Sequence, residues 1–149
     1  MKKHITKIAA ALLLSAGFTS LAHATVPVTG YWSIKQYVEP NLTTYATQGI
    51  CILANNTWYG TNQLWNGNWY QQGNQVEIYG TAPIYHAGTT VDIAVVSFGE
   101  LHSPTTMSGD YAEFNVPGST PLFWDRHYAY DMTWVSATCP AASTVMGAG

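Results

Sequence analysis

The hydrophobic and polar positions of this chain alternate with the two-residue period of a β-strand. In residues 30–38, Trp32 and Ile34 fall on one face, while Ser33 and Lys35 fall on the other. Helical periodicity is nearly absent after the first 24 residues, and β-branched and aromatic residues dominate. The pattern therefore predicts an all-β protein.

Turn residues divide the pattern into about eight short segments. Asn55-Asn56 and Gly73-Asn74 suit tight two-residue hairpins, because Asn and Gly tolerate positive φ. The predicted strands are residues 30–38, 49–54, 57–61, 68–72, 76–82, 90–98, 106–116 and 127–139. Short connections leave no room for crossover helices, so we expect an antiparallel meander, either closed as a barrel or folded as a sandwich.

Residues 1–24 have the pattern of a secretory signal peptide. A lysine-containing start precedes a short apolar stretch, and Ala22-His23-Ala24 is a small-x-small cleavage site. We expect cleavage near Ala24 and a secreted or periplasmic product. Residues 25–140 would form a single β domain, and residues 141–149 a flexible tail.

Cleavage would change the charge balance. Only Lys35 and Arg126 would remain against eight acidic residues, a formal charge of −6 in place of −3. Two cations cannot build the positive surface that nucleic acid or an anionic membrane requires. We expect no nucleic-acid partner and no membrane insertion, which leaves a small apolar molecule, a glycan or a protein as the partner.

The chain has two cysteines, Cys51 and Cys139. In an exported protein they predict one disulfide, which stabilises by at most about 4–5 kcal/mol in the chain-entropy model. Neither cysteine has a second ligand at zinc spacing, so no metal site is expected. No glycine-rich phosphate loop or other cofactor motif is present, and the glycines are assigned to turns.

No catalytic residue is predicted. His86, His102 and His127 form no metal-binding motif, and the nucleophile motif G-x-S-x-G is absent. On a strand, Asp125 and His127 share a face and Arg126 points the other way. The three residues suit an acid–base pair or an anion site at Arg126, but we favour a local ion pair at the start of a strand. A pair of carboxylates across a cleft stays open as the basis of a small hydrolase.

Tryptophans concentrate in residues 57–81. Trp58 and Trp69 each precede a tyrosine, so one ring of each pair faces inward, whereas Trp65 lies in a predicted loop and is expected to be exposed. Trp32 and Trp134 are expected in the core. Aromatic rings beside Asn and Gln suit a sugar or a small planar ligand. The predicted ligand-binding residues are Trp65, Trp69, Tyr70 and Tyr79.

Gly30-Tyr31-Trp32, at the start of the first strand, resembles the G-x-W motif of lipocalins and avidins, the calycin group. Gly67-Asn68-Trp69 repeats the pattern, but the T-D-Y and late arginine motifs of lipocalins are not evident. The resemblance implies a calycin-like up-and-down barrel that binds a small, often apolar ligand. The stretch from Cys51 to Cys139 is also similar to small secreted bacterial proteins without an assigned role.

Three functions follow from the sequence. The first is an exported, non-catalytic binding module for a small molecule or glycan. The second is a secreted protein that acts through a protein–protein surface, as effector-type proteins do, and the third is a small hydrolase. A concave site lined by Trp65, Trp69, Tyr70 and Tyr79 would favour the first function, and an exposed apolar patch the second.

Overall fold

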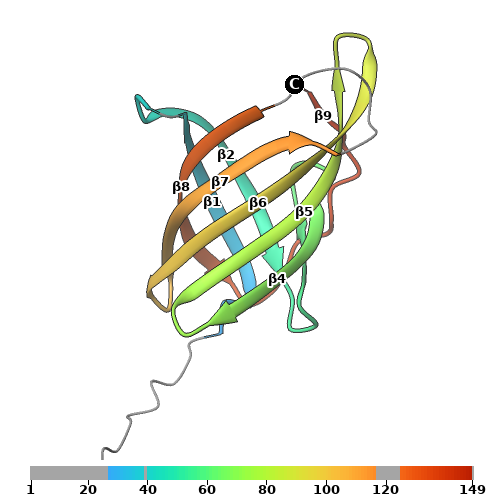
Figure 1. Cartoon of the computed structure of the whole chain (residues 1–149). Coiled ribbons are helices and arrows are strands. Elements are labelled where there is room, and N and C mark those ends of the chain that lie inside the picture. The colour runs from blue at the N-terminus through green and yellow to red at the C-terminus, as the bar shows by residue number, and fades with distance from the viewer. Residues whose placement is uncertain (1–26, 39, 117–124, 149) are drawn as a thin grey trace, which may run out of the picture.

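A computed structural model describes residues 27–38, 40–116 and 125–148. Eight antiparallel strands form a closed barrel, and a short ninth strand pairs with the fifth in the same sheet (Figure 1). The predicted signal peptide lies outside the described residues. The strands are β1 Gly30–Val38, β2 Thr43–Ile52, β3 Thr57–Gly60, β4 Asn66–Gln72, β5 Gln75–His86, β6 Thr89–Ser103, β7 Thr106–Asn115, β8 Asp125–Ser136 and β9 Gly147–Ala148.

Each of the eight barrel strands pairs with its neighbours in the sequence, and β8 returns to pair with β1. At this last junction Trp32 lies opposite Trp134, and Gln36 lies opposite Tyr130. The junction between the first and last strands closes the sheet on itself, which removes the exposed sheet edges. Of the two predicted architectures, the barrel is therefore confirmed.

All eight predicted strands occur, and the main difference is the length of β2. It begins at Thr43, six residues before the predicted strand 49–54. The first half of β2 is polar and exposed but still pairs with β1, so the alternation of hydrophobic and polar residues could not reveal it. The two predicted hairpin turns are confirmed, with φ of 64° at Asn56 and 62° at Gly73.

Indole N–H groups hold the lower end of the barrel, where the chain enters in Figure 1. Trp32 is fully buried and donates to the Val28 carbonyl at 2.7 Å. Trp134, which is partly buried against the core, donates to Thr29 at 3.3 Å. The prediction of a core position is confirmed for Trp32, whereas Trp134 is only partly buried and packs against the core. The two hydrogen bonds anchor the entering segment across the end of the barrel.

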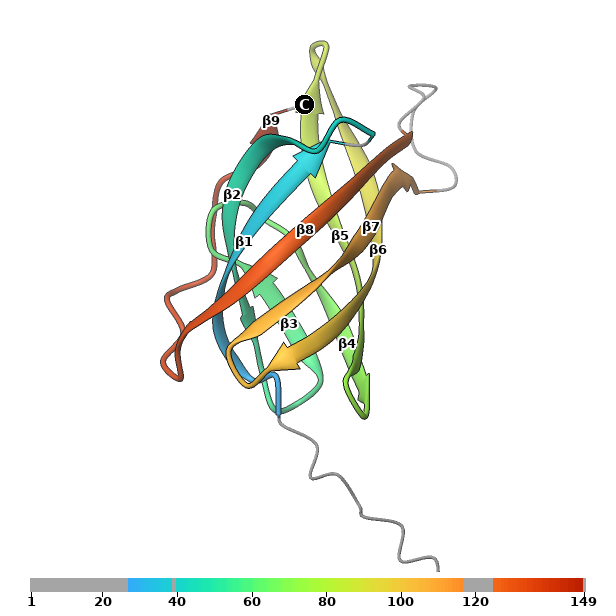
Figure 2. The same cartoon turned by 90° about the vertical axis from the view of Figure 1, so that its left-hand side faces the viewer.

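Strands β3 and β4 are short, so they form the wall only in the lower half of the barrel. Above them, residues 61–65 fold back against β2, where Thr61 N donates to the Gly49 carbonyl at 2.8 Å. The segment after β8 lies beside this loop: Leu64 N donates to the Val145 carbonyl at 3.0 Å, and β9 pairs in parallel with the upper part of β5 (Figure 2). The loop and the C-terminal segment together complete the wall.

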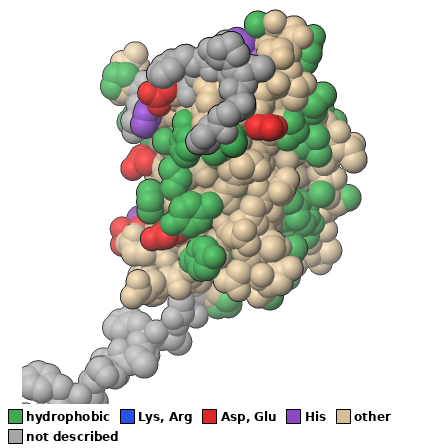
Figure 3. Space-filling model, turned by 45° about the vertical axis from the view of Figure 1, so that its right-hand side comes forward, with side chains coloured by type: hydrophobic (Ala, Val, Ile, Leu, Met, Phe, Trp, Pro, Cys, Tyr) green, Lys and Arg blue, Asp and Glu red, His purple; other side chains and the backbone are tan. Residues whose placement is uncertain are grey.

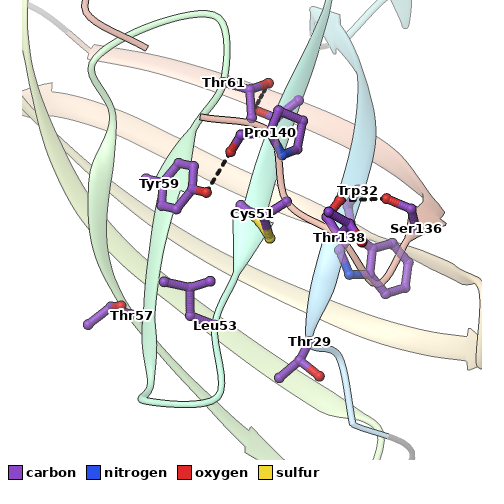
Figure 4. The surroundings of a disulfide bond; sticks show 12 residues. Thr29, Trp32, Cys51, Leu53, Thr57, Tyr59, Thr61, Ser136, Thr138 and Pro140 are labelled. Atoms are coloured by element: carbon purple, nitrogen blue, oxygen red, sulfur yellow. Dashed lines mark hydrogen bonds between the residues drawn. A yellow bond between two sulfur atoms is a disulfide. The ribbon is translucent and has the colours of Figure 1, made fainter. Parts of the chain in front are cut away.

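A disulfide fixes the start of this C-terminal segment. Cys51 on β2 is bonded to Cys139, which lies 88 positions later in the sequence, and their Cα atoms are 5.7 Å apart (Figure 4). Tyr59 donates to the Pro140 carbonyl at 2.6 Å, directly after the bridge. The predicted disulfide is therefore confirmed. No helix long and apolar enough to cross a membrane occurs in the described parts of the chain.

Candidate functional site

A cavity of about 60 Å³ lies inside the barrel. Every barrel strand except β4 contributes to it, and Trp65 adds to it from the loop before β4. Its volume is that of about two water molecules at roughly 30 Å³ each. The lining residues are Ile34, Gln36, Gln48, Ile50, Trp58, Trp65, Ile78, Val95, Ser97, Tyr111, Glu113, Tyr130 and Met132.

One wall of the cavity is apolar, and a pair of strand glycines shapes it. Trp58, Gly67 and Gly80 stand in register on β3, β4 and β5. The indole of Trp58 crosses to β5, where Nε1 donates to the Tyr79 carbonyl at 2.8 Å. A Cβ atom at Gly80 would overlap this indole, so the glycine provides the space in which the ring lies.

The opposite wall repeats the arrangement with a tyrosine. Tyr130, Gly109 and Gly99 stand in register on β8, β7 and β6, and the Tyr130 hydroxyl lies over both glycines. Ser97 donates to this hydroxyl at 2.9 Å. The expectation that the glycines mark turns is wrong for these glycines, which lie within strands. They must lack a side chain because an aromatic side chain from another strand crosses them.

Tyr111 presents the least satisfied polar group of this wall. Its side chain is 8% exposed, and its hydroxyl is buried without a hydrogen bond of acceptable geometry among the described residues. Burial raises the pKa of Tyr111 well above its usual range, nearby Glu113 adds to this, and Gln36 opposes it slightly. The hydroxyl therefore stays protonated at physiological pH, as a donor with no strong acceptor.

The other polar groups around Tyr111 are already paired. Gln48 Nε2 donates to Gln36 Oε1 at 3.1 Å, and the hydroxyls of Ser97 and Tyr130 bond to each other. Burial raises the pKa of Tyr130 to about 12, although the Ser97 hydrogen bond lowers it. These groups form a neutral polar wall facing the tryptophan wall.

A column of tyrosines leads from the cavity toward the upper end of the barrel. The Tyr111 ring stacks on Tyr128 with centroids 4.8 Å apart, and Tyr128 lies 5.2 Å from half-exposed Tyr45. Arg126 Nη1 lies 3.4 Å from the hydroxyls of both Tyr128 and Tyr45. Burial tends to lower the pKa of Arg126, but Tyr128 and the negative charge of Glu113 outweigh it and raise the pKa.

The four predicted ligand-binding residues do not form one site. Trp65 is only 7% exposed, so the expectation of an exposed ring is wrong: its Nε1 donates to Gln63 Oε1 at 3.0 Å, and the ring lines the cavity. Trp69 is buried and donates to the Leu53 carbonyl at the lower end. Tyr70 and Tyr79 lie on the outside of the barrel. Strand alternation places the Tyr70 side chain on the other face of the sheet from the buried Trp69.

Exposed rings gather on the outer face of β4–β7. We call Tyr70, Tyr79, Phe98 and Phe114 the outer aromatic surface. Tyr70 and Tyr79 meet edge to face at 6.2 Å, and Tyr79 donates to the Glu77 carboxylate, which raises the pKa of Tyr79. Figure 3 shows exposed groups of hydrophobic side chains with acidic side chains beside them.

Two polar pairs lie on the outer face of the barrel. Asp125 and His127 are 3.1 Å apart and share a face, as predicted, while Arg126 points inward. His102 Nε2 lies 2.6 Å from Ser108 Oγ, a pair that the sequence did not reveal because the residues come from β6 and β7. His102 is exposed on the outer sheet face and does not line the cavity, and the described residues hold no cluster of metal-ligating side chains.

The sequence carried one signal for the cavity. Gln36, Gln48, Ser97 and Glu113 are polar side chains at inward positions of strands, where alternation calls for apolar residues. Polar groups at such positions indicate a lined interior. No protein-family model, curated protein or solved structure matches this chain, so the geometry of the barrel interior carries the functional assignment.

Proposed function

We propose that this protein is a non-catalytic binding protein that takes a small molecule into the interior of its barrel. The observation that carries the proposal is the buried, unpartnered hydroxyl of Tyr111 at the cavity wall. A buried polar group without a hydrogen bond costs about 1–3 kcal/mol. A ligand that accepts this bond would remove that cost.

The fold supports the proposal. An eight-stranded antiparallel barrel is just wide enough to fill with side chains or to hold one small ligand. Gly30-Tyr31-Trp32 opens β1, and Trp32 is buried at the lower end, which agrees with a calycin-like barrel. The disulfide agrees with a secreted or periplasmic location, where thiols are oxidised.

The cavity limits the size and affinity of the ligand. Its volume of about 60 Å³ is well below the 300–1,000 Å³ of sites for drug-sized ligands. Covalently bonded atoms lie closer together than separate waters do, so the cavity admits about four non-hydrogen atoms, roughly two for each water that it could hold. At a ceiling near 1.5 kcal/mol per atom, binding cannot exceed about 6 kcal/mol, a Kd of about 40 μM. A larger ligand requires side chains such as Met132 to move.

Filling the cavity tests the proposal. Val95 lines the cavity from β6, and Val96 is its neighbour on the outer face. Val95→Phe should abolish binding of small neutral compounds, measured by saturation-transfer NMR against a panel of alcohols, ketones and amides. Val96→Phe, the matched control, should bind them as the parent protein does. Equal binding by both variants would place the ligand elsewhere and refute the proposal.

A second candidate function is recognition of a basic protein through the outer aromatic surface. Glu77 and Asp110 stand in register with Phe98 on either side of it, so carboxylates alternate with rings. Lys or Arg side chains of a partner could pair with the acids and stack on the rings. Phe98→Ser should then weaken binding of a Lys/Arg-rich probe peptide, measured by fluorescence anisotropy, without altering ligand binding in the cavity.

A further inference from the structure

We infer that the ligand is an uncharged carbonyl compound whose oxygen accepts a hydrogen bond from Tyr111. This inference rests on the proposed function, because it names the chemistry of the ligand for the same cavity. It assigns Tyr111 as the residue that selects among small molecules of similar size.

The hydrogen-bond inventory of the wall points to an acceptor on the ligand. Gln36 Oε1 already accepts from Gln48, and the Tyr130 hydroxyl already accepts from Ser97. The Tyr111 hydroxyl has no partner of acceptable geometry among the described residues, although it is more than nine-tenths buried. A protonated hydroxyl can fill this deficit by donating to a ligand oxygen.

The charges around the cavity favour a neutral ligand. Glu113 lines the cavity at the next inward position of β7, and it stands in register with inward-pointing Arg126 on β8. An anionic ligand would be repelled by Glu113. A cationic ligand would have to compete with Arg126, whose pKa is already raised in part by the Glu113 charge. An uncharged ligand meets neither obstacle.

The remaining walls fit the carbon part of such a compound. Trp58, Ile78 and Val95 face the cavity with apolar surface, opposite the tyrosine wall. A short ketone would place its oxygen toward Tyr111 and its alkyl groups against these side chains. Two water molecules are the competing occupants at this volume, and a water could also satisfy Tyr111.

Matched probes separate these occupants. We would titrate the parent protein with acetone, with its hydrocarbon analogue 2-methylpropene and with acetate, each of about four non-hydrogen atoms, following the methyl NMR signals of Ile50 and Ile78. The ketone should bind about 3–10-fold more tightly than the hydrocarbon, the usual range for one neutral hydrogen bond. Acetate should bind more weakly than the ketone.

Tyr111→Phe removes only the hydroxyl and should abolish the ketone preference, leaving the two affinities within about twofold while hydrocarbon binding persists. Tyr70→Phe, on the outer surface, should keep the parent preference. Equal affinities in the parent protein, a preference retained by Tyr111→Phe, or tighter binding of acetate would each overturn this inference but leave the proposed function standing. If no probe shifts the methyl signals up to its solubility limit, both fail and the cavity is a water site.

Discussion

The hydroxyl of Tyr130 occupies the space that a Cβ atom of Gly99, two strands away, would need. The Tyr130 ring starts on β8, passes Gly109 on β7 and ends against Gly99 on β6, where Ser97 donates to the hydroxyl at 2.9 Å. Trp58 crosses β4 to Gly80 on β5 in the same way. Two long aromatic side chains, each spanning three strands, therefore frame the cavity from opposite walls.

Gly99→Ala should destabilise the protein by about 1–3 kcal/mol, because the new methyl group must displace the Tyr130 hydroxyl in a packed interior. The change would appear as a lower urea midpoint with an unchanged slope. Gly73→Asn is the matched control: Gly73 has φ of 62° in an open turn, and a Cβ there meets nothing within 4 Å. This control should stay within about 0.5 kcal/mol. Equal effects of the two variants would contradict the crossing arrangement.

Tyr111→Phe and Tyr130→Phe should change stability in different directions. Removing the Tyr111 hydroxyl eliminates a buried group without a partner, so the free energy of unfolding should stay the same or rise by about 1 kcal/mol. Removing the Tyr130 hydroxyl deprives Ser97 of its acceptor and should cost about 1–2 kcal/mol. Urea unfolding of both variants tests the difference, and a clear loss of stability in Tyr111→Phe would show that its hydroxyl is satisfied.

Alkaline pH should unfold the barrel. In the unfolded chain Tyr130 ionises near its usual pKa of 10, whereas burial raises that pKa to about 12 in the folded protein. Between these values the unfolded chain loses the proton first, so the stabilisation is complete below pH 10 and is lost as the pH rises through 12. About 2 pKa units correspond to about 3 kcal/mol. Urea midpoints at pH values on both sides of 10 measure the decline, which should be shallower in Tyr130→Phe.

Reducing the Cys51–Cys139 bridge should lower the free energy of unfolding by at most about 4–5 kcal/mol, since the bridge closes a loop of 88 residues. Unfolding with and without reductant measures the loss, and a Cys51→Ser/Cys139→Ser double variant should match the reduced protein and ignore reductant. Identical midpoints under both conditions would show that the bridge does not constrain the unfolded chain.

Deleting residues 141–149 should expose Trp65 without unfolding the barrel. The segment bonds to the loop at Gly60 and Leu64, next to the Gln63 side chain that holds the Trp65 indole. Acrylamide quenching of a variant whose only tryptophan in residues 57–81 is Trp65 should increase on deletion. The corresponding Trp58 variant is the control and should be unchanged, because its indole is held by β5. No increase at Trp65 would mean that the loop holds its place unaided.

Sequence periodicity was sufficient to place the strands, because each strand has one face in the core and one in solvent. The two hairpin turns were also predictable from the local sequence, because Asn56 and Gly73 tolerate the positive φ that each turn requires. Periodicity could not decide between barrel and sandwich. That choice depends on the pairing of β1 with β8, which joins residues about a hundred positions apart and leaves no local trace.

The candidate site was harder to predict, since it depends on contacts between distant segments. Trp65 was expected to be exposed because its neighbours are Asn and Gly, yet its ring lines the cavity and its indole donates to Gln63. Tyr111 was not singled out, because alternation shows that a residue points inward without showing whether it meets a neighbour or a void. Only the assembled barrel distinguishes these cases.

The bridge between Cys51 and Cys139 also bears on how the protein matures. Cys139 follows β8, so the native fold brings the two sulfurs together when the last strand docks on the first. Such pairings between distant segments form slowly in β proteins. Until the bridge forms, the chain carries two thiols that can also cross-link separate molecules. Correct oxidation is therefore favoured by the closure of the barrel and afterwards makes that closure covalent.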